Sequence, residues 1–266
     1  MTSARASLHA VEHPGRLPVP APLPPTIHAV CLDIDDTVID FTGSARMALS
    51  ELTGRDDLWP QWQAITDDHH ARAMAGEFDH DTMRRTRTKA FLNAQGADFD
   101  DATVAVLEDR RRDRMAHLWR PFPDAAPTLD WLRAAGLKIA AVTNATHPDQ
   151  HTRLARVGLA RFFDVVISAG ALGVAKPDPE IFYTACTELG VPPSATAHIG
   201  DRLDLDAHAA HQAGLHGIWL DRTGHPHPAP RGIHIIDTLA DLPALLVTEF
   251  RTPDLTTGGA LPAQRA

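Results

Sequence analysis

Short apolar runs alternate with helical patterns along most of this sequence, and this alternation limits the possible folds more than any other feature. The runs span residues 27–32, 138–142, 165–168, 196–199, 217–220 and 233–236. Apolar residues at successive positions are typical of strands that helices cover on both faces of a parallel sheet. The sequence therefore predicts an α/β fold built on a parallel sheet.

Glycine and proline mark the ends of several connecting helices. Gly136 and Gly190 follow helical apolar patterns, at the position where many helices end in a left-handed residue. Pro179 stands where a helix can begin, because its missing N–H group has no partner there anyway. A further helix is expected over residues 206–213, closed by Gly214.

Residues 44–119 interrupt the alternation with helical patterns and no convincing strand. Asp81 is expected to cap one helix that ends near Gly96, and another helix is expected from about residue 101 to 118. Because the block lies between the first two strands, it predicts a helical insertion. Four basic residues of the insertion are expected on a solvated helix face: Arg84, Arg85, Arg87 and Lys89.

Both ends of the chain are expected to be disordered tails. Prolines crowd residues 14–25, and such a run cannot form a packed helix or a central strand. The predicted organisation is a tail at 1–25, a core at 26–43 and 120–250, a helical insertion at 44–119, and a second tail at 251–266.

Composition argues against several classes of protein. The net charge of −9 makes nucleic acid or an anionic membrane a poor main partner, and no apolar run reaches the roughly eighteen residues of a membrane span. The two cysteines, Cys31 and Cys186, lie in apolar stretches, which predicts buried thiols without a disulfide and a cytoplasmic location. No helix shows a long self-pairing seam, so both a monomer and a homodimer are expected possibilities.

Acidic residues follow the first apolar run directly. Asp33 comes at its end, and Asp35 lies two residues on. Ligands of a parallel α/β sheet bind at the carboxyl ends of its strands, where one carboxylate can attack phosphorus. A second carboxylate can protonate the leaving group and then activate water. Acidic turns after strands are common, so Asp33 and Asp35 alone leave a structural role equally open.

Polar residues also follow the later strands. Thr143 and Asn144 can hydrogen-bond phosphate oxygens, and Lys176 can neutralise charge on a transferring phosphoryl group. Asp201 can bind a hard cation through oxygen, with a glycine before it that permits a tight turn. Asp206 can orient that site or hold a metal-bound water.

Together these residues resemble the four motifs of the haloacid dehalogenase (HAD) superfamily, in the order of that family. Residues 33–37 look like motif one, and Thr143, Lys176 and residues 200–206 look like motifs two, three and four. The resemblance covers about residues 27–245. It implies a Rossmann-like doubly wound parallel sheet with an inserted α-helical C1 cap, as in subfamily I, and a flap and hinge at residues 38–43.

The resemblance also implies a role for each residue. Asp33 would attack phosphorus and form an aspartyl-phosphate, and Asp35 would act as general acid and then as general base. Mg²⁺ would be held by the Asp33 side chain, the Asp35 backbone carbonyl and Asp201. The phosphate would be held by Thr143, Asn144 and Lys176.

The implied activity is hydrolysis of a small-molecule phosphate monoester, such as a nucleoside monophosphate or a sugar phosphate. Residues 35–41 and 76–87 are similar to those of bacterial pyrimidine nucleotidases, and N-acylneuraminate-9-phosphatases look similar too. The alternatives are a phosphomutase, a 2-haloacid dehalogenase and a catalytically silent binding scaffold. Asp35 argues against the dehalogenase, because a halide leaving group needs no acid.

Overall fold

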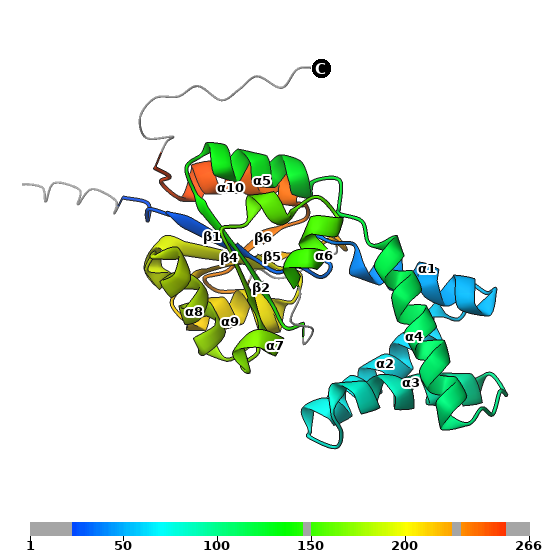
Figure 1. Ribbon diagram of the computed structural model, residues 1–266. Helices are drawn as coiled ribbons and strands as arrows, with labels where there is room; N and C mark the ends of the chain where they lie inside the picture. Colours follow the sequence, from blue (N-terminus) through cyan, green and yellow to red (C-terminus); the bar gives the residue numbers. More distant parts are fainter. Residues whose placement is uncertain (1–22, 146–149, 225–229, 254–266) are drawn as a thin grey trace, which may run out of the picture.

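A six-stranded parallel sheet forms the centre of the computed structural model, which describes residues 23–145, 150–224 and 230–253. The strand order is β3-β2-β1-β4-β5-β6 (Figure 1). The strands are β1 (Ala29–Leu32), β2 (Lys138–Thr143), β3 (Val165–Ser168), β4 (Thr196–Gly200), β5 (His216–Leu220) and β6 (His234–Ile236). All six lie at the predicted places, and every neighbouring pair is parallel.

Helices cover both faces of the sheet. The layer of α5 (Ala125–Ala134) and α10 (Leu242–Glu249) packs on one face, and α8 (Pro179–Leu189) and α9 (Ala209–Gln212) lie on the other (Figure 1). Side chains of β1 alternate between these layers, with Val30 and Leu32 in the first core and Ala29 and Cys31 in the second. The predicted doubly wound α/β fold is therefore confirmed.

The other helical segments of the sheet region are short and lie in the connections of the sheet. They comprise α6 (Gln150–Arg156), α7 (Ala169–Leu172), 3₁₀ turns at Ala160–Phe162, Pro193–Ala195 and Leu239–Asp241, and a π-helical turn at Leu203–His208. The expected helix over 206–213 is therefore wrong in its first half. There the chain runs in the wider π turn before α9, a distortion that often marks functional sites.

Four helices between β1 and β2 form the insertion. They are α1 (Phe41–Thr53), α2 (Trp59–Met74), α3 (His80–Ala94) and α4 (Asp101–Leu118). They extend to one side of the sheet region and connect to it at both ends of the insertion (Figure 1). Their apolar side chains form separate clusters, such as that of Leu49, Leu58, Trp62 and Phe91.

Two expectations for the insertion are wrong. The cap of α3 is Asp79, whose carboxylate accepts from the backbone N–H of Thr82 at 2.7 Å, while Asp81 lies in the first turn. Arg87 is buried rather than solvated, because Glu108 of α4 binds it.

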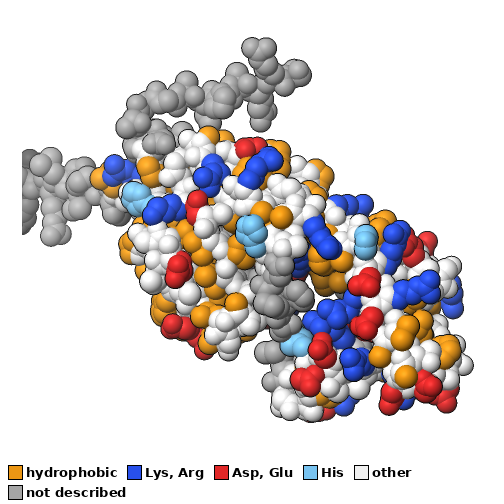
Figure 2. Space-filling model, viewed as in Figure 1, with side chains coloured by type: hydrophobic (Ala, Val, Ile, Leu, Met, Phe, Trp, Pro, Cys, Tyr) orange, Lys and Arg blue, Asp and Glu red, His pale blue; other side chains and the backbone are white. Residues whose placement is uncertain are grey.

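In the view of Figure 2, basic side chains gather where the insertion borders the sheet region.

The two ends of the described chain meet beside the sheet. Ile27 donates its backbone N–H to the carbonyl of Arg251 at 2.8 Å, and Arg251 donates to the carbonyl of Pro25 at 2.9 Å. Most of both predicted tails, residues 1–22 and 254–266, lies outside the described residues. Within the described part, no helix is both long and apolar enough to cross a membrane.

Candidate active site

The carboxyl ends of β1 and β4 lie side by side at the point where the strand order reverses. Leu32 of β1 pairs with Ala141 of β2 and with Ile199 of β4, so the residues that follow these strands share one edge of the sheet. The backbone N–H of Asp33 donates to the carbonyl of Ile199 at 2.9 Å. Such a reversal of strand order opens the crevice in which α/β sheets bind ligands.

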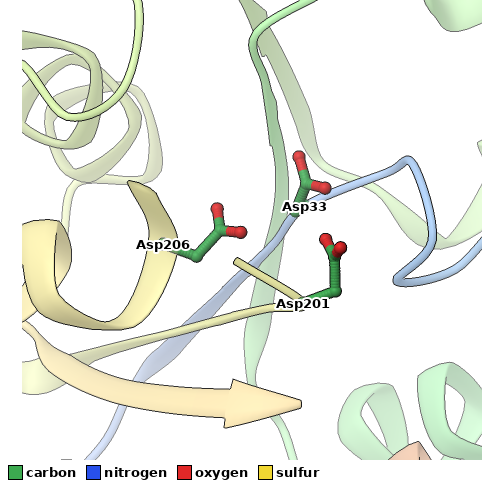
Figure 3. Close-up of side chains that lie close together, drawn as sticks. All are labelled: Asp33, Asp201 and Asp206. Carbon is green, nitrogen blue, oxygen red and sulfur yellow. The ribbon is translucent and has the colours of Figure 1, made fainter. Parts of the chain in front are cut away.

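Three carboxylates meet at this edge. Asp33 follows β1, Asp201 follows β4, and Asp206 lies in the π-helical turn beyond it, with their side chains converging in Figure 3. Each of the three offers a carboxylate oxygen, and these oxygens all lie within 4.8 Å of one another. Carboxylate oxygens are hard ligands suited to Mg²⁺ or Ca²⁺.

Lys176 joins two of these carboxylates. Its Nζ lies 2.6 Å from Asp33 Oδ1 and 2.6 Å from Asp206 Oδ1, and it also donates to the carbonyl of Val142 at 3.1 Å. Burial lowers the pKa of Lys176, but the two carboxylates outweigh this effect and raise the pKa above its usual range. Lys176 is therefore a fixed cation beside Asp33.

Asn144 sets the position of Lys176. Its Oδ1 accepts from the backbone N–H of Lys176 at 2.7 Å, and its Nδ2 donates to the Lys176 carbonyl at 2.8 Å. Thr143 is buried at the end of β2, and its Oγ1 accepts from the backbone N–H of Ala145 at 3.2 Å. The structure thus gives Asn144 a positioning role, and its contact with phosphate stays a prediction.

Gly200 makes room for the Asp206 carboxylate. A Cβ at position 200 would lie 2.2 Å from Asp206 Cγ, far below any real contact. The residue is glycine because a side chain approaches it closely, and not because the backbone needs a positive φ, as the expected tight turn suggested. Asp206 in turn accepts from the Arg202 backbone N–H at 3.1 Å and contacts His198 Nε2 at 3.0 Å.

The site carries more negative charge than its own cations balance. Burial and neighbouring carboxylates raise the pKa of Asp33 to about 7 and that of Asp201 to about 8. Asp206 behaves differently, because Lys176 and His198 overcome the effect of burial and lower its pKa. The negative charge that no cation of the site balances therefore lies on Asp33 and Asp201, and a divalent cation between these two carboxylates would balance it. The residues present fit a divalent metal.

Asp35 and Asp36 continue the turn after Asp33, with different surroundings. The Asp35 side chain is 31% exposed, whereas that of Asp33 is 9% exposed. Asp36 has a φ of 56°, and its carboxylate accepts from the N–H and Oγ1 of Thr42 at 2.8 and 2.7 Å. Asp36 therefore shapes the turn, and Asp35 is the more exposed carboxylate beside Asp33.

The family model of haloacid dehalogenase-like hydrolases matches residues 27–214. The chain belongs to this family. The predicted family, fold class and hydrolase assignment are thereby confirmed, and the matched segment contains all seven predicted site residues. What each of these residues does in the reaction stays a prediction.

Curated relatives of this hydrolase include phosphatases of different substrates. The glyceraldehyde 3-phosphate phosphatase of Methanopyrus kandleri is 30% identical over 220 residues, which are 77% of this chain and 88% of the relative. The pyrimidine 5′-nucleotidase YjjG of Escherichia coli is 28% identical over 221 residues, 80% of this chain and 93% of the relative. The second agrees with the resemblance to pyrimidine nucleotidases.

Solved structures share the fold of this hydrolase. YfnB from Bacillus subtilis, a HAD-hydrolase bound to magnesium, has a TM-score of 0.72 at 24% identity and covers 83% of this chain and 99% of its own. The 2-haloacid dehalogenase of Pseudomonas syringae has a TM-score of 0.60 at 28% identity and covers 84% and 99%. The fold is therefore common to relatives with different chemistry, and residues at the site must separate the activities.

Two residues of this hydrolase's site were not foreseen from sequence. Arg153 of α6 donates from Nη2 to Asp35 Oδ1, across 118 sequence positions. His198 is fully buried on β4 and contacts Asp206. A histidine inside an apolar strand needs a polar partner, which is a signal that sequence reading could have used. No local pattern indicates the partner of Arg153.

Proposed function

We propose that this protein is a magnesium-dependent phosphatase that hydrolyses a small-molecule phosphate monoester through an aspartyl-phosphate on Asp33. A nucleoside monophosphate or a sugar phosphate is the proposed class of substrate. The proposal rests on the phosphatases among the relatives and on the chemistry that this chain's own residues can perform.

The observation that carries the proposal is the contrast between Asp33 and Asp35 on one short turn. Asp33 is nearly buried and lies 2.6 Å from the Lys176 ammonium. Asp35 is partly exposed and pairs with the Arg153 guanidinium. Two carboxylates with such different surroundings suit two different roles in one reaction.

Asp33 and Asp35 can together carry out the bond changes and proton transfers of the reaction. An Asp33 carboxylate oxygen attacks phosphorus, the ester P–O bond breaks, and the leaving oxygen takes the proton of Asp35. Water then attacks the phosphorus of the aspartyl-phosphate and gives its proton to Asp35. The bond between phosphorus and Asp33 breaks, which frees inorganic phosphate and restores the carboxylate. Lys176 stabilises negative charge beside Asp33 in both steps.

The metal site in this proposal consists of the side chains of Asp33 and Asp201 and the backbone carbonyl of Asp35. When bound there, Mg²⁺ supplies positive charge that reduces the repulsion between the anionic nucleophile and the anionic phosphate. Asp206 stays on the Lys176 side, because Lys176 and His198 already engage its Oδ1. Thr143 and Asn144 are proposed to contact the phosphate.

The helical insertion is proposed to be a cap domain that selects the substrate, with the core at 26–43 and 120–250 and the cap at 44–119. Its separate apolar clusters support this division, because the insertion does not depend on the sheet for its core. Residues 38–43 are proposed as flap and hinge. Asp40 there binds Arg120 at 2.8 Å, which ties together the two connections to the insertion.

Three alternatives predict different products. A 2-haloacid dehalogenase would release halide, a phosphomutase would return an isomerised phosphate ester, and a silent scaffold would bind phosphate esters without turnover. Asp35 favours the phosphatase over the dehalogenase, because an alkoxide leaving group needs a proton and a halide does not.

The deciding experiment measures phosphate release from p-nitrophenyl phosphate and from a panel of nucleoside monophosphates and sugar phosphates, with and without Mg²⁺. Asp33→Asn is expected to abolish turnover, because an amide is no nucleophile for phosphorus. Asp204→Asn is the control, because it makes the same chemical change at an exposed carboxylate close to the site. Full activity of Asp33→Asn would refute the mechanism, and chloride release from 2-chloropropionate without phosphatase activity would favour the dehalogenase.

A further inference from the structure

Arg153 lies where the insertion joins the sheet region. The centre of its guanidinium is 4.6 Å from the Trp119 ring centroid and 5.5 Å from that of Phe41. Phe41 is the first residue of α1, and Trp119 directly follows α4, so the two rings belong to the two connections of the insertion. The Arg153 side chain is only 7% exposed.

The same guanidinium holds one oxygen of Asp35. Nη2 of Arg153 donates to Asp35 Oδ1, and among the described residues no donor contacts Oδ2. A carboxyl group can accept a hydrogen bond at one oxygen while it donates or accepts a proton at the other. The contact with Arg153 therefore fixes which oxygen of Asp35 remains available to the substrate.

We propose that Arg153 is a positioning residue that orients Asp35 Oδ2 toward the leaving group, and that the Phe41 and Trp119 rings tie this orientation to the placement of the insertion. This rests on the proposed function, because it assumes that Asp35 donates the proton. The planar guanidinium suits the role, since it stacks on aromatic rings while its N–H groups reach a carboxylate. A shift of the insertion that moves either ring would then move the proton donor as well.

The leaving group provides a test that a purely structural role would not pass. p-Nitrophenolate leaves without a proton, whereas the alkoxide from p-nitrobenzyl phosphate needs one, and the two esters are close in size. The parameter kcat/KM reports the steps up to leaving-group departure, and therefore excludes the later use of Asp35 as a base. A positioned general acid contributes roughly 10²- to 10⁴-fold, so partial misplacement of Asp35 should be measurable.

The experiment compares kcat/KM of Arg153→Met for the two esters in the full-length protein with Mg²⁺. For p-nitrobenzyl phosphate we expect a loss of about tenfold to hundredfold, and for p-nitrophenyl phosphate a loss below about threefold. Arg153→Lys should recover part of the benzyl activity, because it keeps a cation near Oδ1. Arg156→Met, at an exposed position of the same helix, removes an equal charge and should leave both values unchanged.

A double-variant comparison then asks whether Arg153 acts through Asp35. In an Asp35→Asn background, Arg153→Met should cause no further loss on p-nitrobenzyl phosphate, because the group that it positions has been removed. Trp119→Phe and Phe41→Leu should show the same selectivity for the leaving group, with smaller losses.

Several outcomes would overturn the proposal. Equal losses of kcat/KM on both esters would make Arg153 a substrate-binding or structural residue, and so would additive losses with Asp35→Asn. If Arg153→Met also lowered the thermal midpoint, its kinetics could reflect loss of structure, and Arg153→Lys would then be the deciding variant. Equal losses of kcat/KM on both esters in Arg153→Lys would overturn the positioning role. If the unsubstituted protein hydrolysed neither ester nor any phosphate of the panel, the proposed function would fail, and with it the role of Arg153.

Discussion

The side-chain amide of Asn144 forms two hydrogen bonds with the backbone of Lys176, accepting from its N–H at 2.7 Å and donating to its carbonyl at 2.8 Å. This relationship links the end of β2 to the loop before α8, 32 residues later in the chain. Lys176 is buried, so its backbone N–H and carbonyl depend on this partner. The two hydrogen bonds between the Asn144 amide and the Lys176 backbone therefore help to place the Lys176 ammonium beside Asp33.

Asn144→Ala should therefore displace Lys176 and lower phosphatase activity. Misplacement of a catalytic group by about 1 Å can cost on the order of a hundredfold, and we expect a loss of kcat/KM of about that size. Leaving buried backbone groups unpaired should also cost about 1–3 kcal/mol in free energy of unfolding. The check is steady-state kinetics together with urea unfolding, with Asn93→Ala at an exposed site of α3 as control. Unchanged activity in Asn144→Ala would show that Lys176 holds its place without Asn144.

Gly200→Ala should push the Asp206 carboxylate away from Lys176 and His198. The added Cβ would lie 2.2 Å from Asp206 Cγ, and overpacking of this kind typically costs about 1–3 kcal/mol. Activity should fall with stability, because Lys176 loses one of its two carboxylate partners. The thermal midpoint and kcat/KM are the measurements.

The control for Gly200→Ala is a comparison in the Asp206→Ala background. Once the carboxylate is absent, the methyl group at position 200 has room, so the double variant should be no less stable than Asp206→Ala alone. Additive losses would mean that the close approach of Asp206 is not the reason for glycine at this position.

Glu108 holds the interior of the insertion together. Its Oε1 accepts from Arg87 and Arg111, each at 2.9 Å, and its Oε2 accepts from Thr88 at 2.8 Å and from Arg111 at 2.9 Å. Both guanidinium groups lie over the Trp62 ring, at 4.4 and 4.8 Å. Burial would raise the pKa of Glu108, but the two arginines and Thr88 keep it below its usual value.

Glu108→Ala should destabilise the insertion by about 3–5 kcal/mol, because it leaves two buried guanidinium groups without their carboxylate. Glu51→Ala is the matched control, since Glu51 pairs with Arg114 at the surface. Exposed pairs of that kind contribute about 0–1 kcal/mol. Denaturant unfolding followed by tryptophan fluorescence measures both losses, and similar values for the two variants would contradict the predicted difference.

The contribution of Asp33 and Asp201 to stability without metal should fall as the pH rises from about 4 to 8, which a comparison with Asp201→Asn over this range measures. Burial, together with neighbouring carboxylates, raises the pKa of Asp33 to about 7 and that of Asp201 to about 8. In the unfolded chain these two groups titrate near pH 4, so within this window they bind more protons in the folded protein than in the unfolded chain. Burial lowers the pKa of four histidines, which opposes this effect below about pH 6.5: His70, His80, His198 and His234. The lowered pKa of Asp206 and the raised pKa of Lys176 act outside the window.

Mg²⁺ should reverse this trend, because it favours the ionised carboxylates. We expect a larger rise in thermal midpoint on adding Mg²⁺ at pH 8 than at pH 5, where protons compete for the same oxygens. At about a hundredfold excess over Kd, the gain in free energy of unfolding is about 2.7 kcal/mol. Asp201→Asn should remove most of the gain, whereas Asp204→Asn at a neighbouring exposed carboxylate should keep it. Equal gains at the two pH values would contradict the titration of Asp33 and Asp201.

Local sequence predicted the ends of elements better than it predicted side-chain partners. Gly136 and Gly190 stand at helix ends with φ of 74° and 64°, because glycine adopts this conformation at little cost. The basic cluster at residues 84–89 predicts Arg87 in solvent, although Met83 and Phe91, four positions before and after it, are buried on the same face of α3. Its burial depends on Glu108, which is 21 positions away on another helix, and local patterns carry no information about such a partner.

The sequence by itself determined that Asp33, Thr143 and Asp201 lie at one edge of a parallel sheet. Each directly follows a buried strand or closes one, and the carboxyl ends of parallel strands share an edge. Only the tertiary structure decided that β1 lies between β2 and β4, that Lys176 reaches both Asp33 and Asp206, and that Arg153 holds Asp35. Strand ends follow from short-range patterns of apolar and polar residues, whereas these contacts join residues 30 to 143 positions apart and exist only once the sheet and its crossovers have packed.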